Sequence, residues 1–201
     1  MSGSRRCFRH AQWVAMAGAL LLLSGCGINN IPSYKQQVDA AWSQVLNEYQ
    51  RRTDLIPNLV ATVKGYAAHE ASVLEAVTEA RAKVAQTRIP PDILTNPKAF
   101  QAFERNQATL SGALSRLMVV TENYPNLKAD QNFLTLQAQL EGTENRIAVA
   151  RRDYILAVQQ YDTELATIPG RWYHSVFYGS YQPIQNFTIS EQAQQAPAVH
   201  F

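Results

Sequence analysis

Apolar residues recur every seven positions through the last third of this chain, and that spacing restricts the fold more than any other feature. The repeat comprises Phe133, Leu140, Ile147, Tyr154, Tyr161 and Ile168, flanked by Leu136, Val158 and Leu165. Side chains spaced in this way lie along one side of an α-helix and form a seam against a neighbouring helix. We therefore predict one long helix that packs lengthwise against others.

Two earlier segments carry related spacing. The first alternates by four and three residues through Val38, Trp42, Val45, Tyr49, Arg52, Ile56, Leu59, Val63, Tyr66, Glu70, Val73, Val77, Ala80 and Val84. The second comprises Phe100, Phe103, Gln107, Leu110, Leu114, Leu117 and Thr121. No segment alternates with period two for long enough to predict a strand. The predicted fold class is all-α, an antiparallel up-and-down helical bundle with coiled-coil-like seams.

Pro57 lies inside the first seam, where its ring removes a backbone hydrogen bond and clashes with the preceding turn. We expect one long helix kinked there, or two helices with Asp54 capping the second, so that the bundle has four helical segments. If the first helix continues straight through Pro57, it is longer than its neighbours, and the apolar stripe from Val38 to Tyr49 stays uncovered. An apolar patch of that size implies a partner.

The N-terminus has the order of a bacterial lipoprotein signal. Three arginines precede an apolar stretch from Trp13 to Leu23, which is followed by small residues and then Cys26. This stretch is shorter than the roughly 20 residues that span a bilayer, so a retained transmembrane helix is the weaker alternative. We expect Cys26 to carry lipid, and membrane lipid to be the first partner of the mature chain.

Two details of this signal bear on location. The run from Ser4 to Arg9 resembles a twin-arginine export motif, although an ordinary positive start explains it as well. Gly27 follows the lipid-bearing residue, at a position where an acidic residue commonly retains lipoproteins on the inner membrane. We expect a lipid-anchored protein on the periplasmic side, with the outer membrane favoured over the inner.

Signal removal changes the charge balance. The chain has 18 Lys and Arg against 16 Asp and Glu, and the segment 1–25 contains three of the arginines and no acid. The mature chain therefore keeps 15 basic and 16 acidic residues. This balance excludes the basic surface of a nucleic-acid-binding protein. Cys7 leaves with the signal and Cys26 carries lipid, so no disulfide is expected.

Several motifs occur in a characteristic order: Arg51 to Val60, Glu122 to Pro125, Thr143 to Ile147, Ala150 to Tyr154 and Pro197 to Phe201. Together they resemble the LemA family of bacterial membrane-associated helical proteins over roughly residues 30–201. The resemblance implies a helical bundle and carries over no catalytic residue. This chain departs from the family at Tyr154-Ile155 and Tyr161-Asp162, where Tyr-Asn pairs are common. It also departs in having a lipoprotein signal, where many members have an N-terminal transmembrane helix.

The expected organisation has four parts. They are a signal peptide at 1–25, a lipidated leader at 26–32, a LemA-like bundle at 33–170, and an aromatic-rich segment with a flexible tail at 171–201. The aromatic residues from Trp172 to Tyr181 suit either a membrane interface or the open end of the bundle, and we expect the second.

The residue types that perform reactions are not arranged in a recognisable site. His69-Glu70 lacks the second histidine four residues later that a zinc-protease helix requires. No nucleophile elbow, phosphate-binding loop or dinucleotide fingerprint is present. We expect no enzyme activity, no metal and no cofactor.

Charged residues near the seams are the remaining candidate site, as a polar core or a ligand site: Arg51, Arg52, Asp54, Glu70, Glu144 and Arg151. Glu70 on a packed face needs a partner, for which Arg151, Arg152 and Lys64 are candidates, or it lies in water at the edge of the seam. The residues around Pro57 form either a hydrogen-bonded corner or an anion site at a helix start.

The chain ends in Val199-His200-Phe201, an apolar pattern with a free carboxylate. Domains that bind C-terminal peptides as an added strand recognise this pattern, and envelope proteases carry such domains. A tail that packs on its own bundle, or stays loose, is the alternative.

These observations favour a non-catalytic scaffold or interaction protein of the cell envelope, with envelope proteins as partners and a homo-oligomer left open. The alternative is a binding module for a small envelope ligand seated near Arg51, Arg52, Glu70 and Arg151. A closed core favours the scaffold, whereas a polar cavity ringed by those charges favours the ligand module.

Overall fold

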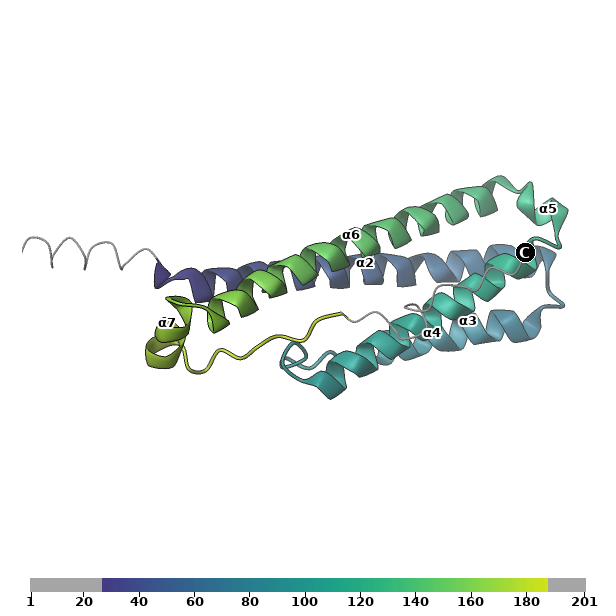
Figure 1. Cartoon of the computed structure of the whole chain (residues 1–201). Coiled ribbons are helices and arrows are strands. Elements are labelled where there is room, and N and C mark those ends of the chain that lie inside the picture. Colours follow the sequence, from purple (N-terminus) through teal and green to yellow (C-terminus); the bar gives the residue numbers. More distant parts are fainter. Residues whose placement is uncertain (1–26, 188–201) are drawn as a thin grey trace, which may run out of the picture.

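The computed structural model describes residues 27–187, which contain six helices. Four are long: α2 (Asn30–Tyr66), α3 (Ala71–Gln86), α4 (Pro97–Thr121) and α6 (Gln131–Ala166). Two are short: α5 (Pro125–Lys128) and α7 (Gly170–Phe177). Consecutive long helices run in opposite directions (Figure 1). The predicted all-α, antiparallel bundle is confirmed.

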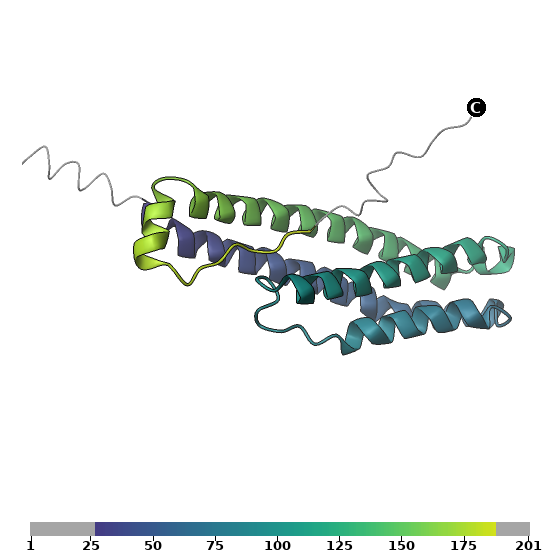
Figure 2. The same cartoon turned by 60° about the horizontal axis from the view of Figure 1, so that its bottom comes forward.

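The two halves of the bundle are built differently. Helices α2 and α6 lie side by side along their length, and the shorter α3 and α4 pack against the half where α2 ends and α6 begins (Figures 1 and 2). The other half is completed by α7 and by residues 178–187, which we call the C-terminal strap. The strap runs back from α7 toward the start of α4 (Figure 2), where the Gln185 amide donates to the Leu94 carbonyl at 2.7 Å.

The core consists of two apolar clusters. The first fills the half that contains α7 and includes Val38, Trp42, Val45, Tyr49, Phe100, Phe103, Ile147, Tyr154, Tyr161, Ile184 and Phe187. The second fills the other half and includes Ile56, Leu59, Val63, Leu74, Val77, Leu110, Leu114, Leu117, Leu127, Phe133 and Leu140. The sequence spacing anticipates both, because every position predicted for the seam of α4 is buried. In α6, five of the six heptad positions are buried, and Ile168 is exposed beyond the end of the helix.

The structure decides between the two alternatives at Pro57, and the division into two helices there is wrong. Helix α2 continues through Pro57 to Tyr66, and the chain turns at residues 67–70 instead. A proline has no N–H to bond the carbonyl four residues earlier, which here belongs to Thr53. Arg81 of α3 supplies the missing donor, because its Nε donates to the Thr53 carbonyl at 3.2 Å. Asp54 therefore caps no second helix, and its carboxylate accepts from Gln50 at 2.7 Å.

This arrangement gives a testable prediction about Arg81. Arg81→Ala is expected to lower the free energy of unfolding by about 1–3 kcal/mol, because the Thr53 carbonyl loses its donor. In a Pro57→Ala background the loss is expected to be smaller, since the alanine N–H can bond that carbonyl. Urea unfolding of the four proteins of this cycle measures the difference. An equal loss in both backgrounds would show that Arg81 does not compensate for the proline.

The stripe from Val38 to Tyr49 is covered, so it does not form the apolar patch that a straight first helix implied. Helix α6, the start of α4 and the strap all pack on it, as part of the first cluster. Trp42 contacts four other rings, with centroid distances of 5.2 Å to Phe103, 5.5 Å to Tyr154, 5.7 Å to Phe100 and 6.3 Å to Phe187. The first apolar seam is divided between α2 and α3 by the turn at residues 67–70. The part of α2 that α3 and α4 do not reach is covered by the strap.

Helix α6 holds the strap through residues of its heptad seam. The hydroxyls of Tyr154 and Tyr161 donate to the Gln185 and Gln182 carbonyls at 2.6 and 3.1 Å. Burial, together with the nearby Asp162 charge, raises the pKa of Tyr161 to about 12, so its hydroxyl remains a donor at ordinary pH. Asp162 accepts from the Ile184 amide at 3.2 Å.

The Asp162 carboxyl gives a pH-dependent prediction. Burial raises its pKa, an effect that the hydrogen bond from Ile184 partly offsets. A raised native pKa means that the group stabilises the fold below its unfolded pKa, and that this stabilisation is lost as the pH rises through the native value. Asp162→Asn keeps an acceptor oxygen and removes the charge, so it is expected to raise the melting temperature at about pH 7. The gain should shrink below about pH 4, where the wild-type carboxyl is protonated. Thermal unfolding of both proteins across this range measures it, and a gain independent of pH would contradict it.

Helix α2 begins at Asn30, three residues before the expected start at residue 33, with Pro32 in its first turn. The expectations for the signal peptide, for lipidated Cys26 and for recognition of Val199 and Phe201 lie outside the described residues. Within the described part of the chain, no helix has both the length and the hydropathy needed to cross a membrane.

Candidate functional site

A layer of polar side chains separates the two apolar clusters, and Arg52 is at its centre. Arg52 lies on α2 between Tyr49 of the first cluster and Ile56 of the second. Its side chain is only 1% exposed, and six polar or charged residues are buried in the described part of the chain: Glu48, Arg52, Thr53, Gln107, Thr121 and Thr143. A buried guanidinium costs free energy unless it is paired and hydrogen-bonded, so its partners decide what the site can do.

The guanidinium of Arg52 bonds acceptors from two other helices. Its Nη1 donates to Ser111 Oγ of α4 at 2.8 Å and to Glu144 Oε1 of α6 at 2.9 Å. Its Nη2 donates to the side-chain oxygen of Gln107 at 2.6 Å. The guanidinium carbon lies 5.0 Å from the centroid of the Tyr49 ring. One side chain thus joins α2, α4 and α6, and only its Nε has no partner among the described residues.

A second ion pair lies beside the first. Arg146 Nε of α6 donates to Glu48 Oε2 of α2 at 3.0 Å, and Arg146 Nη2 donates to Thr143 Oγ1 at 2.8 Å. The burial is reversed here, because the Glu48 side chain is buried whereas that of Arg146 is partly exposed. The two pairs cross the α2–α6 interface with opposite polarity.

The structure brings three of the six charged residues proposed as a site around Tyr49, because the charges of Arg151, Arg52 and Glu144 all act on its hydroxyl. Arg52 and Glu144 form an ion pair, and the Glu144 side chain is 44% exposed. Arg51 and Asp54 are exposed on the outside of α2. Glu70 lies in the turn between α2 and α3, and Arg151 lies in the half of the bundle that contains the strap.

Neither Glu70 nor Arg151 pairs with the other. Glu70 Oε1 accepts from the Tyr124 hydroxyl at 2.9 Å, which ties the α2–α3 turn to the residue that precedes α5. The Arg151 guanidinium lies 4.3 Å from the centroid of the Phe187 ring, over the strap. The expected pairing of Glu70 with an arginine or lysine is therefore replaced by a tyrosine, and Glu70 is partly exposed.

Five further residues belong to the polar layer but were not recognised as site residues: Glu48, Gln107, Ser111, Thr143 and Arg146. Gln107 could have been recognised from the sequence, because it is a polar residue at a predicted seam position of α4. Thr143 lies between Leu140 and Ile147, at the intermediate position of the α6 seam, and could have been found in the same way. Glu48 and Arg146 occupy no seam position, so periodicity gives no signal for their pairing.

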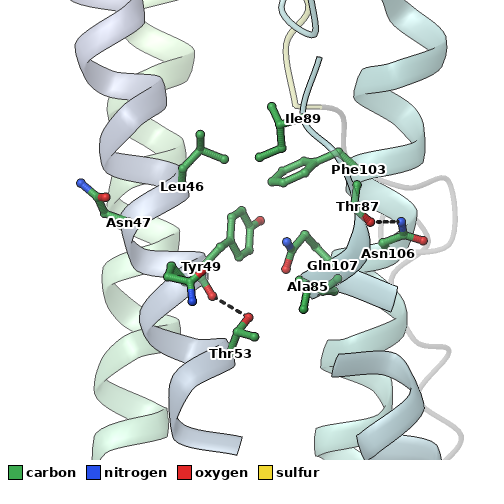
Figure 3. A pocket seen from close by; sticks show the side chains of 12 residues that line it. Leu46, Asn47, Tyr49, Thr53, Ala85, Thr87, Ile89, Phe103, Asn106 and Gln107 are labelled. Atoms are coloured by element: carbon green, nitrogen blue, oxygen red, sulfur yellow. Dashed lines mark hydrogen bonds between the residues drawn. The ribbon is translucent and has the colours of Figure 1, made fainter. Parts of the chain in front are cut away.

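A pocket of about 340 Å³ lies next to this layer, between α2, the segment after α3, and α4. Figure 3 shows Tyr49 and Thr53 on one side facing Phe103 and Gln107 on the other, with Ile89 near its upper edge. None of its twelve lining residues is charged. The pocket therefore offers apolar surface, hydroxyls and amides, but not the ring of charges that an anion-binding module needs.

The arrangement offers no obvious reaction chemistry. The Arg52 N–H groups that form hydrogen bonds are engaged by protein acceptors, and its Nε is buried. Among residues 27–187, no group of three or more His, Cys, Asp or Glu side chains is placed to hold a metal ion. The side chains of the polar layer form their hydrogen bonds with one another.

Comparison with known proteins gives two findings. The sequence profile of the LemA family matches residues 41–201. Two curated relatives from Paramagnetospirillum magneticum, magnetosome protein MamQ 1 and magnetosome protein MamQ 2, are each 27% identical to this chain over 165 residues. The matched region covers 74% of this chain and 58% of each relative, so the chain spans less than two thirds of their length.

Proposed function

The chain belongs to the LemA family, and on that premise we propose that it is a membrane-anchored, non-catalytic helical bundle that acts as a scaffold or interaction protein of the cell envelope. The names of the MamQ relatives refer to the magnetosome and to no reaction. Lipid on Cys26 provides the anchor in this proposal, and Val199 and Phe201 provide an end that a peptide-binding protease domain recognises.

One observation carries the scaffold role. The conspicuous buried charge of the bundle, Arg52, donates to acceptors of α4 and α6 and not into a cavity. A guanidinium held in this way fixes three helices relative to one another and leaves its bonded N–H groups unavailable to a ligand. The polar layer therefore supports a rigid body whose outer surface does the binding.

The ligand-module alternative has less support. Arg51 is on the outside of α2 and Glu70 is in the α2–α3 turn, so of its four residues only Arg52 and Arg151 act on a common group, the Tyr49 hydroxyl. The pocket beside Arg52 is lined by uncharged residues. A neutral ligand remains compatible with that pocket, and the crosslinking experiment below separates a site at the polar layer from a scaffold.

The anchor is tested first. Cells that express the full chain and take up labelled palmitate are expected to incorporate the label into the wild-type protein and not into Cys26→Ala. Each protein is isolated and its bound label is measured. A wild-type chain without label would remove the lipid anchor from this proposal.

The interaction role is tested in the same cells with a photo-reactive residue at Leu156, an exposed position of α6. A scaffold is expected to crosslink to the same discrete envelope proteins in the wild-type background and in Arg52→Met. Crosslinks that disappear in folded Arg52→Met would favour a site at the polar layer. The absence of discrete crosslinks at Leu156 and at a second exposed position, Val149, would count against the scaffold.

A further inference from the structure

Helix α7 presents an apolar face to the outside of the bundle. Trp172, Val176 and Phe177 are 62%, 71% and 62% exposed, and Ile168 just before the helix is 64% exposed. The other side of α7 is attached, because Tyr173 packs on the first apolar cluster and the ring nitrogen Nε2 of His174 lies 2.8 Å from the Tyr181 carbonyl oxygen. The helix is therefore fixed to the bundle with its large apolar side chains pointing away from it.

Helix α7 lies at the end of the bundle where the described chain begins (Figures 1 and 2). A side chain at Gly27 would start 3.4 Å from the Tyr173 ring and 3.6 Å from Pro169. Next to it, the Asn30 side chain donates to Glu164 Oε1 at 3.2 Å, which joins the start of α2 to the end of α6. Consecutive Cα atoms are about 3.8 Å apart, so Cys26 is within one residue of the α7 contact.

We propose that the exposed face of α7 is a second membrane contact, which enters the interfacial region of the bilayer that holds Cys26. This inference rests on the lipid anchor of the proposed function, since acyl chains on Cys26 bring the bilayer surface next to α7. Tryptophan and phenylalanine side chains suit the interface, and the exposed Arg171 beside Trp172 suits anionic headgroups.

The position of the face distinguishes a bilayer from a second copy of the chain. A second copy seated on Trp172 and Val176 would have to occupy the space beside the anchored residue, where the bilayer surface lies. The apolar face of α7 and the anchored residue lie at the same end of the bundle, so one bilayer can contact both.

The experiment uses a single thiol on the full, lipidated chain. Val176→Cys places a probe on the α7 face, and Val119→Cys is the matched control, because Val119 is 70% exposed near the end of α4. Each protein is labelled with an environment-sensitive fluorophore and reconstituted into phosphatidylethanolamine–phosphatidylglycerol vesicles that contain nitroxide-labelled lipid. The probe at residue 176 is expected to emit at shorter wavelength and to be quenched several-fold more than the probe at residue 119.

The outcomes separate this inference from the anchor. The wild-type chain should not label, because Cys7 leaves with the signal and Cys26 carries lipid. If it remains unlabelled and vesicle-bound while probes 176 and 119 behave alike, the α7 contact is wrong and the anchor stands. If it labels and leaves the vesicles, both are wrong. A blue-shifted probe at 176 that lipid nitroxides do not quench would indicate a protein contact and would overturn the membrane assignment.

Discussion

Arg52→Ala is expected to lower the free energy of unfolding by about 3–5 kcal/mol, the largest loss that we expect from a single charged residue in this bundle. The substitution removes three side-chain hydrogen bonds, to Ser111, Glu144 and Gln107, together with the packed aliphatic part of the arginine. It leaves the Gln107 side chain buried without its partner. Glu144 can regain water because it is partly exposed, which places the expected loss toward the lower end of the range.

The neighbouring arginine provides the matched control. Arg51→Ala removes the same atoms from an exposed position of the same helix and should change stability by no more than about 0.5 kcal/mol. Arg52→Met combined with Gln107→Leu fills the space and removes the unpaired amide, so it should recover most of the stability, as buried polar groups replaced by apolar ones often do. Urea unfolding of these proteins measures the differences. Equal losses for Arg51→Ala and Arg52→Ala would mean that the polar layer does not stabilise the bundle.

Phe187→Ala is expected to destabilise the fold by about 3 kcal/mol, although the residue lies far along the strap from the last helix. Its ring centroid is 5.1 Å from that of Phe100 and 5.4 Å from that of Tyr154, and Arg151 stacks on its face. Removal of this ring leaves a cavity in the first cluster and exposes part of Trp42, which the ring also contacts.

Phe177→Ala serves as the control for this change. Phe177 undergoes the same substitution on α7, where its side chain is 62% exposed, so the loss should stay within about 0.5 kcal/mol. Thermal and urea unfolding of both variants compare the two positions. If Phe187→Ala is as stable as Phe177→Ala, the strap is a surface segment and the first cluster does not need it.

The spacing of apolar residues was sufficient to predict the class, the antiparallel order and most of the core that the long helices contribute. It succeeded because each long helix buries one face against its neighbours, so Leu110, Leu117, Leu140 and Tyr154 repeat with the period of the helix. The same pattern placed Arg52 on the seam, although a charge there looked like an exception.

Pattern alone could not predict the features that depend on contacts between distant parts of the chain. From the sequence, Pro57 predicts a kink or a break in the helix. The helix continues because Arg81, 24 residues later in the sequence, donates to the Thr53 carbonyl that the proline leaves without a partner. The strap has no helical period, and Ile184 and Phe187 are buried because Tyr154, Tyr161 and Asp162 hold its backbone. The partner of Glu70 depends on the turn at residues 67–70, which the sequence pattern did not mark, and the partner of Arg151 depends on the strap.

The absence of a linker before α2 has a mechanical consequence. Only Gly27 to Asn29 separate Cys26 from a helix of 37 residues, which is about 55 Å long. If Cys26 is acylated as we propose, so short a connection restricts how far the bundle can swing, and we expect the tip formed by α5 and the α2–α3 turn to stay at a nearly constant distance from the lipid. A partner that binds this tip would then meet it at that distance from the membrane.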